Sequence, residues 1–173
     1  MKPSPFAAAF LLIMNRLRIA SGLAALACLL LFFTNCNYEV PITEKPTQKI
    51  DEKFLGDWET KDGDKTLKMK IARLDEWNYI VSFDDNLYRA FHSDVAGTPY
   101  FSVLQLDEKK QTWSYSTWKI ADDGALVGKS VSDKVVPDET RDSATVQKLL
   151  KENASNPGLF ADNEMRFTRA KKE

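Results

Sequence analysis

The single histidine of this chain, His92, stands beside Ser93 and Asp94. These three residue types form the catalytic triad of many hydrolases, in which the histidine takes the proton of the serine. Triad members come from separate elements that converge in space, whereas neighbours along an extended chain point to opposite faces. We therefore expect His92 to be a strand-end or surface histidine rather than a general base.

Carboxylates offer a second chemistry, because two of them held at a set separation can hydrolyse glycosides. The candidates are Asp84, Asp85, Asp94, Asp122 and Asp123. They fall in expected hairpin turns, where aspartate is favoured because its side chain bonds the nearby backbone. The sequence also contains neither a Gly-x-Ser-x-Gly motif nor a phosphate loop. These patterns predict that the protein is not an enzyme.

The chain offers few residues that could bind a metal or a cofactor. Both cysteines, Cys28 and Cys36, lie in the N-terminal region, so the rest of the chain offers one histidine and no thiolate. Zinc and copper sites need more imidazole or thiolate ligands than that. The run Asp122-Asp123-Gly124 lacks the alternating ligand spacing of a calcium loop. We expect no metal and no cofactor.

The most unusual composition is the aromatic run Trp113-Ser114-Tyr115-Ser116-Thr117-Trp118. In a strand, Trp113 and Tyr115 share one face, and Trp118 falls on the other unless a bulge intervenes. One face could line a cavity; alternatively, these aromatics simply fill a core, since they are good strand formers. The candidate residues for lining a small apolar ligand are Tyr79, Phe83, Trp113 and Tyr115.

The elements that would position these residues are short strands. Apolar and polar residues alternate in runs separated by turn residues, which is typical of half-buried strands. The runs are 67–71, 79–83, 87–92, 100–106, 111–120, 125–131 and 165–169. Their close spacing predicts a mainly β domain, an antiparallel meander that closes into a barrel or packs as a sandwich.

One segment has a helical period instead. Val146, Leu149 and Leu150 form a single apolar stripe after two good N-cap residues, Asp142 and Ser143. The turn residues 156–158 end the pattern. We predict an amphipathic helix from Ser143 to about Asn153, followed by the last strand.

The N-terminal region has the composition of a bacterial secretion signal. Arg16 and Arg18 precede fifteen mostly apolar residues, Ile19 to Phe33, which as a helix would span roughly 22 Å, short of a hydrocarbon core of ~30 Å. The end at Cys36 resembles the lipobox, in which a cysteine is acylated and becomes the mature N-terminus. The alternatives are an uncleaved anchor helix and secretion with cleavage elsewhere. We expect residues 1–36 to be a lipoprotein signal, with Met14 as the native start.

Residues 37–53 form an expected spacer that contains Pro41 and Pro46. Extended, they would reach at most ~56 Å and would hold the domain off the membrane. By resemblance to the lipoprotein sorting pattern, the absence of aspartate at Asn37 favours the outer membrane, facing the periplasm. All 25 acidic residues follow Cys36. The resulting mild acidity argues against nucleic-acid binding.

The expected domain, residues 54–173, opens with Phe54-Leu55-Gly56-Asp57-Trp58. This run resembles the Gly-x-Trp that opens lipocalins and related calycin barrels. The resemblance implies that Trp58 plugs the closed end of a barrel and that an arginine of the last strand, Arg166 or Arg169, lies across its ring. The alternative is that Trp58 is a core aromatic of another β fold.

Two functions are compatible with these observations. The first is a lipid-anchored envelope protein that binds a small apolar ligand in a lipocalin-like barrel. The second is an envelope interaction module or inhibitor without a cavity, acting through the helix at 143–153 and the Pro-Gly turn after it. Interior space of several hundred cubic ångströms would favour the first function.

Overall fold

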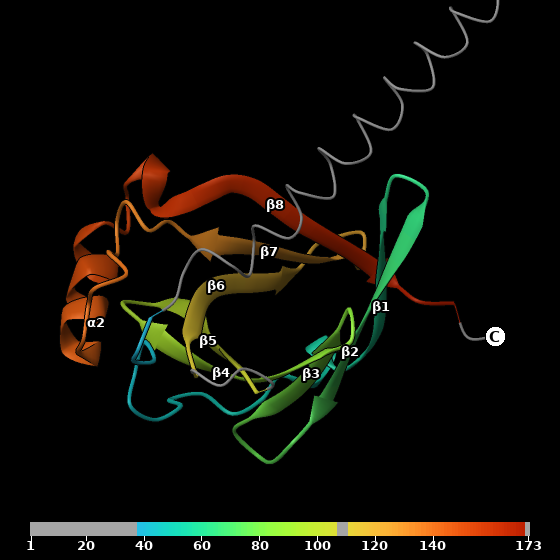
Figure 1. The fold of residues 1–173 in the computed structure, drawn as a ribbon, viewed down its shortest axis with the longest axis horizontal. Helices are drawn as coiled ribbons and strands as arrows, with labels where there is room; N and C mark the ends of the chain where they lie inside the picture. The colour runs from blue at the N-terminus through green and yellow to red at the C-terminus, as the bar shows by residue number, and fades with distance from the viewer. Residues whose placement is uncertain (1–37, 107–110, 172–173) are drawn as a thin grey trace, which may run out of the picture.

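The computed structural model describes residues 38–106 and 111–171, which form a closed antiparallel β-barrel (Figure 1). Expectations for the signal region and for Cys36 therefore lie outside the described residues. The strands are β1 (Gly56–Asp62), β2 (Lys65–Arg73), β3 (Tyr79–Phe83), β4 (Asn86–Val95), β5 (Thr98–Gln105), β6 (Trp113–Ile120), β7 (Leu126–Val131) and β8 (Phe160–Arg169). The helical elements are η1 (Glu52–Phe54), α2 (Ser143–Glu152) and η2 (Pro157–Leu159).

Each strand pairs with its neighbours in sequence, and β8 returns to pair with β1. This topology confirms the predicted antiparallel barrel and excludes the sandwich. The β3–β4 hairpin shows how the turns set the register. Phe83 pairs with Asn86 across Asp84 and Asp85, which both have positive φ, at 46° and 66°. Two-residue hairpin turns of this kind match the strand twist, and aspartate tolerates the left-handed conformation.

The barrel has two hydrophobic cores because several strands are buried on both faces. The inner core lies inside the barrel and includes Trp58, Met69, Phe83, Phe101, Leu126 and Phe167. The outer core lies on the outside of β4–β7 and includes Phe91, Tyr100, Trp113, Tyr115 and Val131. Two further elements shield the outer core from solvent.

The first cover is α2, which begins where the sequence predicted. Asp142 is the N-cap, and its carboxylate accepts a hydrogen bond of 2.7 Å from the Thr145 N–H. Val146 and Leu150 are fully buried in the outer core. This confirms the predicted amphipathic helix before the last strand. It also means that the apolar stripe of α2 already has its partner within the chain.

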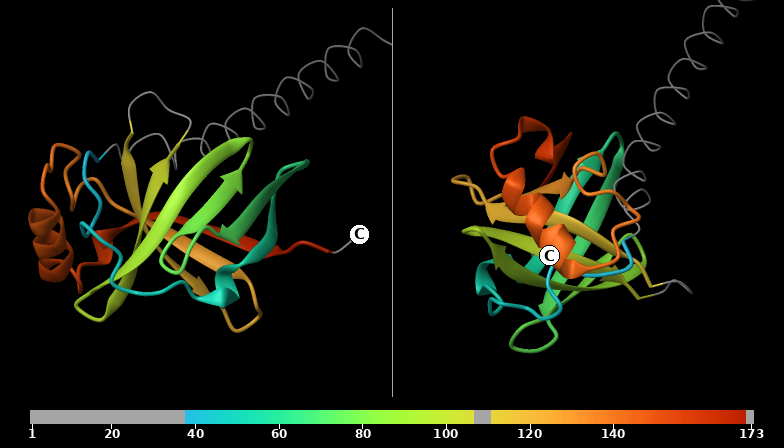
Figure 2. Two further views of the ribbon diagram at one scale, coloured as in Figure 1. Left: turned by 90° about the horizontal axis from the view of Figure 1, so that it is seen from below. Right: turned by 90° about the vertical axis from the view of Figure 1, so that its left-hand side faces the viewer.

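The second cover is residues 38–50, which we call the N-terminal strap. It runs along the outside of the barrel from the α2 side to η1 (Figure 2). Tyr38 and Trp113 form a backbone bridge with hydrogen bonds of 3.0 and 2.8 Å, and Ile42 donates its N–H to Ser102 Oγ at 3.0 Å. Tyr38 and Ile42 have no exposed surface.

The spacer role expected for residues 37–53 therefore does not fit the described part of that segment. The alternation of Tyr38, Val40 and Ile42 with polar or proline residues is a strand-like pattern, although it is short. Its apolar side chains are buried between α2 and the barrel wall. A proline-containing segment can be stiff and still pack, because proline restricts the backbone without preventing contacts of its neighbours.

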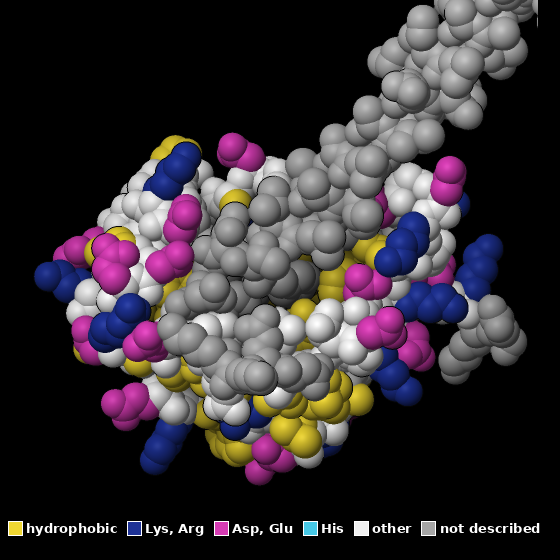
Figure 3. Space-filling model, in the orientation of Figure 1, with side chains coloured by type: hydrophobic (Ala, Val, Ile, Leu, Met, Phe, Trp, Pro, Cys, Tyr) yellow, Lys and Arg dark blue, Asp and Glu magenta, His cyan; other side chains and the backbone are white. Residues whose placement is uncertain are grey.

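On the face shown in Figure 3, basic and acidic side chains are interspersed around the barrel. Several form exposed ion pairs, such as Lys129 with Glu164 at 3.6 Å and Arg141 with Glu39 at 3.2 Å. Exposed pairs of this kind add little stability, typically below about 1 kcal/mol. The stability of the domain therefore rests on its two cores.

An Ile42→Ala substitution distinguishes a packed strap from a free spacer. A packed strap predicts a loss of about 2–5 kcal/mol in the free energy of unfolding, because the substitution leaves a cavity in the outer core. Chemical denaturation followed by tryptophan fluorescence measures the loss. Glu44→Ala, at an exposed position of the same strap, is the matched control and should change the value by less than about 0.5 kcal/mol. Equal, small effects of both substitutions would contradict the packed strap.

Candidate ligand-binding cavity

Trp58 is the centre of a cluster that joins η1, the first strand and the last strand, which we call the plug. The Trp58 side chain is 1% exposed, and its Nε1–H donates to the Phe54 carbonyl at 2.9 Å. The Arg169 guanidinium lies 4.1 Å from the centre of the Trp58 ring. It also donates to the carbonyls of Leu55 at 2.6 Å and Lys53 at 2.8 Å. Arg169 thus binds the first strand and η1 to the last strand.

Gly56 has a physical role in this plug. Its φ is +130°, a conformation that side chains rarely adopt, and a Cβ there would overlap Nη1 of Arg169. The Gly-x-Trp spacing therefore leaves room for the arginine that covers the tryptophan. The other candidate, Arg166, instead pairs with Asp123 at the surface. Hydrogen bonding from the Ala125 N–H and from Arg166 lowers the pKa of Asp123.

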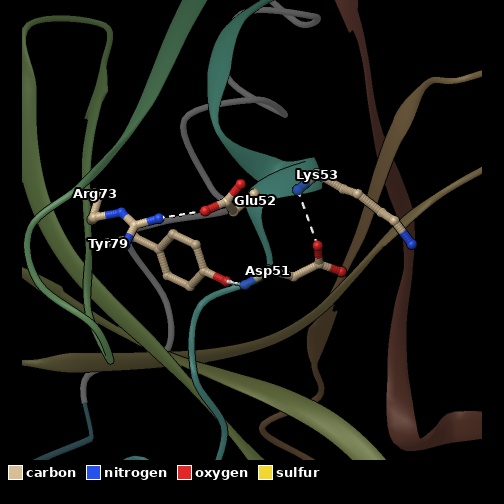
Figure 4. Close-up of polar contacts among 5 residues, drawn as sticks. All are labelled: Asp51, Glu52, Lys53, Arg73 and Tyr79. Carbon is tan, nitrogen blue, oxygen red and sulfur yellow. Dashed lines mark hydrogen bonds and ion pairs between the residues drawn. The ribbon is translucent and has the colours of Figure 1, made fainter.

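Side chains of β2 and β3 hold the chain that leads into η1 (Figure 4). The Asp51 N–H donates to the Tyr79 hydroxyl oxygen at 2.6 Å, and Arg73 donates to Glu52 at 2.5 Å. Burial raises the pKa of Tyr79 to about 12, so the hydroxyl stays protonated at neutral pH. Strands β2 and β3 thus hold the segment that closes the barrel.

His92 belongs to this plug, and the expected strand-end or surface position is wrong. The side chain is 5% exposed, and its ring lies 5.0 Å from that of Phe101 and 5.7 Å from that of Tyr79. Nε2 hydrogen-bonds the Lys49 carbonyl, which can only accept, so Nε2 carries the proton. His92 therefore ties the strap to the inner core.

Beyond the plug, the barrel interior holds a cavity of about 70 Å³. Its walls are mostly apolar and include Met69, Phe101, Leu126 and Met165. Of the side chains expected to line a cavity, Tyr79, Phe83 and Tyr115 border it. The fourth, Trp113, is not among its lining residues and packs in the outer core.

The two faces of the aromatic strand β6 pack in different cores: Trp113 and Tyr115 lie in the outer core, and Trp118 packs against the inner core. The Tyr115 ring stacks on Tyr38 at 4.0 Å, so its main packing partner is the strap. Trp118, on the other face, borders the cavity and lies flat against Gly128, where a Cβ would be 2.6 Å from the indole ring. The sequence analysis missed Trp118 as a lining residue. Both faces of β6 are largely buried, so alternation alone does not show which face points inward.

The carboxylates considered as acid–base candidates serve as turn residues. Asp84 and Asp85 form the β3–β4 turn, and Asp94 accepts a hydrogen bond of 2.9 Å from the Gly97 N–H in the next hairpin. Asp123 accepts one of 3.2 Å from the Ala125 N–H. Within residues 38–106 and 111–171, no group of three or more His, Cys, Asp or Glu side chains is placed to hold a metal ion.

Comparison of the chain with protein-family models, with curated proteins and with solved structures found no significant match. In the part of the chain that the structure describes, no helix combines the length and the apolar character needed to cross a membrane.

Arg169→Ala tests the plug. The substitution removes a cation–π contact and two hydrogen bonds, so we expect a loss of about 1–2 kcal/mol in the free energy of unfolding. Arg166→Ala removes an arginine from the same strand but breaks only an exposed ion pair, and should cost less than about 0.5 kcal/mol. Denaturant titration of both variants gives the comparison. A loss for Arg166→Ala as large as that for Arg169→Ala would refute the role assigned to Arg169.

Proposed function

We propose that the protein is a lipid-anchored protein of the bacterial envelope whose barrel binds a small apolar molecule. The observation that carries the proposal is the apolar cavity inside a barrel closed at one end by Trp58. An apolar void lacks partner atoms on its inner side, so its walls lose dispersion contacts. An apolar guest restores those contacts without needing polar partners.

The size of the cavity limits the guest. Typical small-molecule sites enclose about 300–1,000 Å³, and an engineered apolar cavity of about 150 Å³ binds benzene. A cavity of about 70 Å³ therefore takes only a very small or slender molecule as it stands. Met69 and Met165 line it, and methionine side chains change rotamer readily. Their movement would admit a short hydrocarbon chain.

The relation to lipocalins forms part of the proposal. It is supported by the Arg169 guanidinium over the Trp58 ring and by the close approach of Gly56 to Arg169. These contacts are the arrangement that the Gly-x-Trp resemblance implies. A barrel of this type presents its interior, rather than an exposed groove, to its ligand.

The lipid anchor is supported by the signal-like sequence that ends at Cys36. With the strap packed from Tyr38 onward, Asn37 alone would separate the lipidated cysteine from the folded domain. The barrel would then lie at the membrane surface, where apolar molecules concentrate.

Ala90→Leu tests ligand binding in the interior. Ala90 lines the cavity and is buried, so a larger side chain there occupies the space of the guest. We expect binding of hexane, a slender hydrocarbon, measured by NMR chemical-shift titration, to weaken at least about tenfold, while filling the cavity keeps or raises stability by up to about 1 kcal/mol. Ala72→Leu, on the outer face of β2, is the matched control. Unchanged hexane binding by the Ala90→Leu protein would exclude the interior as the site.

Cys36→Ser tests the anchor. Two or more acyl chains give a lasting membrane attachment, at about 0.8 kcal/mol per buried CH₂. The substituted protein should move from the membrane fraction to the soluble fraction after signal removal and keep its fold, as judged by circular dichroism. Retention of the processed Cys36→Ser protein in the membrane would rule out the lipid anchor.

A further inference from the structure

Apolar side chains on one side of the barrel remain outside both cores. In the part of the chain that the structure describes, three large apolar side chains are exposed: Leu74 at 51%, Trp77 at 36% and Leu87 at 38%. Leu74 and Trp77 lie in the turn between β2 and β3, and Leu87 lies near the start of β4. Together with the half-buried Ile80 of β3, they form what we call the β2–β4 patch, and none of the four belongs to either core. Exposed apolar groups that gather in one region mark an interaction site.

The strand register connects the β2–β4 patch with the start of the strap. One row of directly opposed residues crosses the sheet from β2 to the strap: Ala72, Ile80, Arg89, Leu104, Trp113 and Tyr38. Opposed residues point to the same face of a sheet. Leu104, Trp113 and Tyr38 belong to the outer core, so Ile80 and Arg89 also lie on the outside of the barrel. Ile80 is four strand spacings of about 4.8 Å, or roughly 19 Å, from Tyr38 along the sheet.

Two cations border the patch. Arg89 lies in the row beside Ile80, and the Lys49 ammonium lies 5.7 Å from the centre of the Trp77 ring. The two acids of the adjoining turn, Asp75 and Glu76, balance these cations, so this surface has no net negative charge that a bilayer would repel. Tryptophan is enriched where proteins meet the headgroup region of a membrane, and the long side chains of lysine and arginine reach from such positions to the polar layer.

The chain length before the strap decides what covers this surface. Tyr38 follows Cys36 by two residues, which can span at most about 7 Å. A lipid on Cys36 would therefore hold the wall beside Tyr38 close to the bilayer. From these observations we infer that the β2–β4 patch docks on the lipid bilayer, so that the barrel lies on its side with Trp77 and Leu87 at the headgroup level. The inference rests on the lipid anchor of the proposed function and adds the surface that faces the membrane.

Nitroxide spin labels on the lipidated chain test the docking surface in vesicles of phosphatidylethanolamine and phosphatidylglycerol. With lipid on the Cys36 sulfur and Cys28 removed with the signal, the cysteine of Leu87→Cys is the only free thiol. The matched control is Lys129→Cys, at an exposed position of β7 on the opposite side of the barrel. Oxygen concentrates in the bilayer and a nickel chelate stays in water, so the ratio of their collision rates with the label reports its depth. We expect this ratio to be at least about threefold higher at position 87 than at position 129, because an apolar face at a membrane surface is buried about 5–10 Å deep.

A second substitution shows whether the patch itself makes the contact. Trp77→Glu should lower the ratio at position 87 at least about twofold, because a carboxylate resists leaving water. Ser155→Glu adds the same charge at an exposed position between α2 and η2 and should leave the ratio unchanged.

Equal ratios at positions 87 and 129 would overturn the inference, as would an unchanged ratio in the Trp77→Glu protein. Few collisions with either reagent at position 87 would also overturn it, because they would show that a second copy of the chain covers the patch. In each of these cases, retention on the vesicles that Cys36→Ser abolishes would leave the lipid anchor standing. If the chain with Cys36 intact does not stay with the vesicles, the anchor and the inference both fail.

Discussion

The contact of Arg169 with Trp58 is the constraint on which the barrel depends. The seam between β1 and β8 pairs only at Trp58 with Arg169 and at Glu59 with Thr168, whereas β1 pairs with β2 along its whole length. A short ladder leaves the first and last strands free to separate, and an open edge would expose unpaired backbone groups. The guanidinium lies over the indole ring at this seam and donates to the two carbonyls just before β1. One side chain therefore links the last strand to the first strand and to η1.

The outer face of β4–β7 is apolar, and the strap and α2 bury it. A barrel of short strands encloses little volume, so its inner core alone buries a limited area. The outer core adds a second buried layer over β4–β7, covered by Tyr38 and Ile42 from one end of the chain and by Val146 and Leu150 from the other. His92 hydrogen-bonds the strap at the Lys49 carbonyl, and the Tyr79 hydroxyl accepts the Asp51 N–H where the strap leads into η1.

The same architecture explains the character of the cavity. Charged side chains lie on the outer surface, where water solvates them, and the strands turn apolar side chains inward. On the wall formed by β6 and β7, Gly128 makes room for the Trp118 ring.

Local patterns in the sequence were enough to predict the alternating strands, the hairpin turn at Asp84-Asp85 and the helix after Asp142, but they left a barrel and a sandwich both open, and the pairing of β1 with β8 decided for the barrel. Each depends on periodicity or backbone preference within a few residues. The tertiary structure alone decided that residues 38–50 pack as a strap, that His92 is buried, and that Trp118 rather than Trp113 faces the cavity. For the strap and for His92 the deciding contact joins residues far apart in the chain, Tyr38 with Tyr115 and His92 with Lys49. Periodicity shows that a strand has two faces, but only the partners that cover each face determine which one points into the barrel.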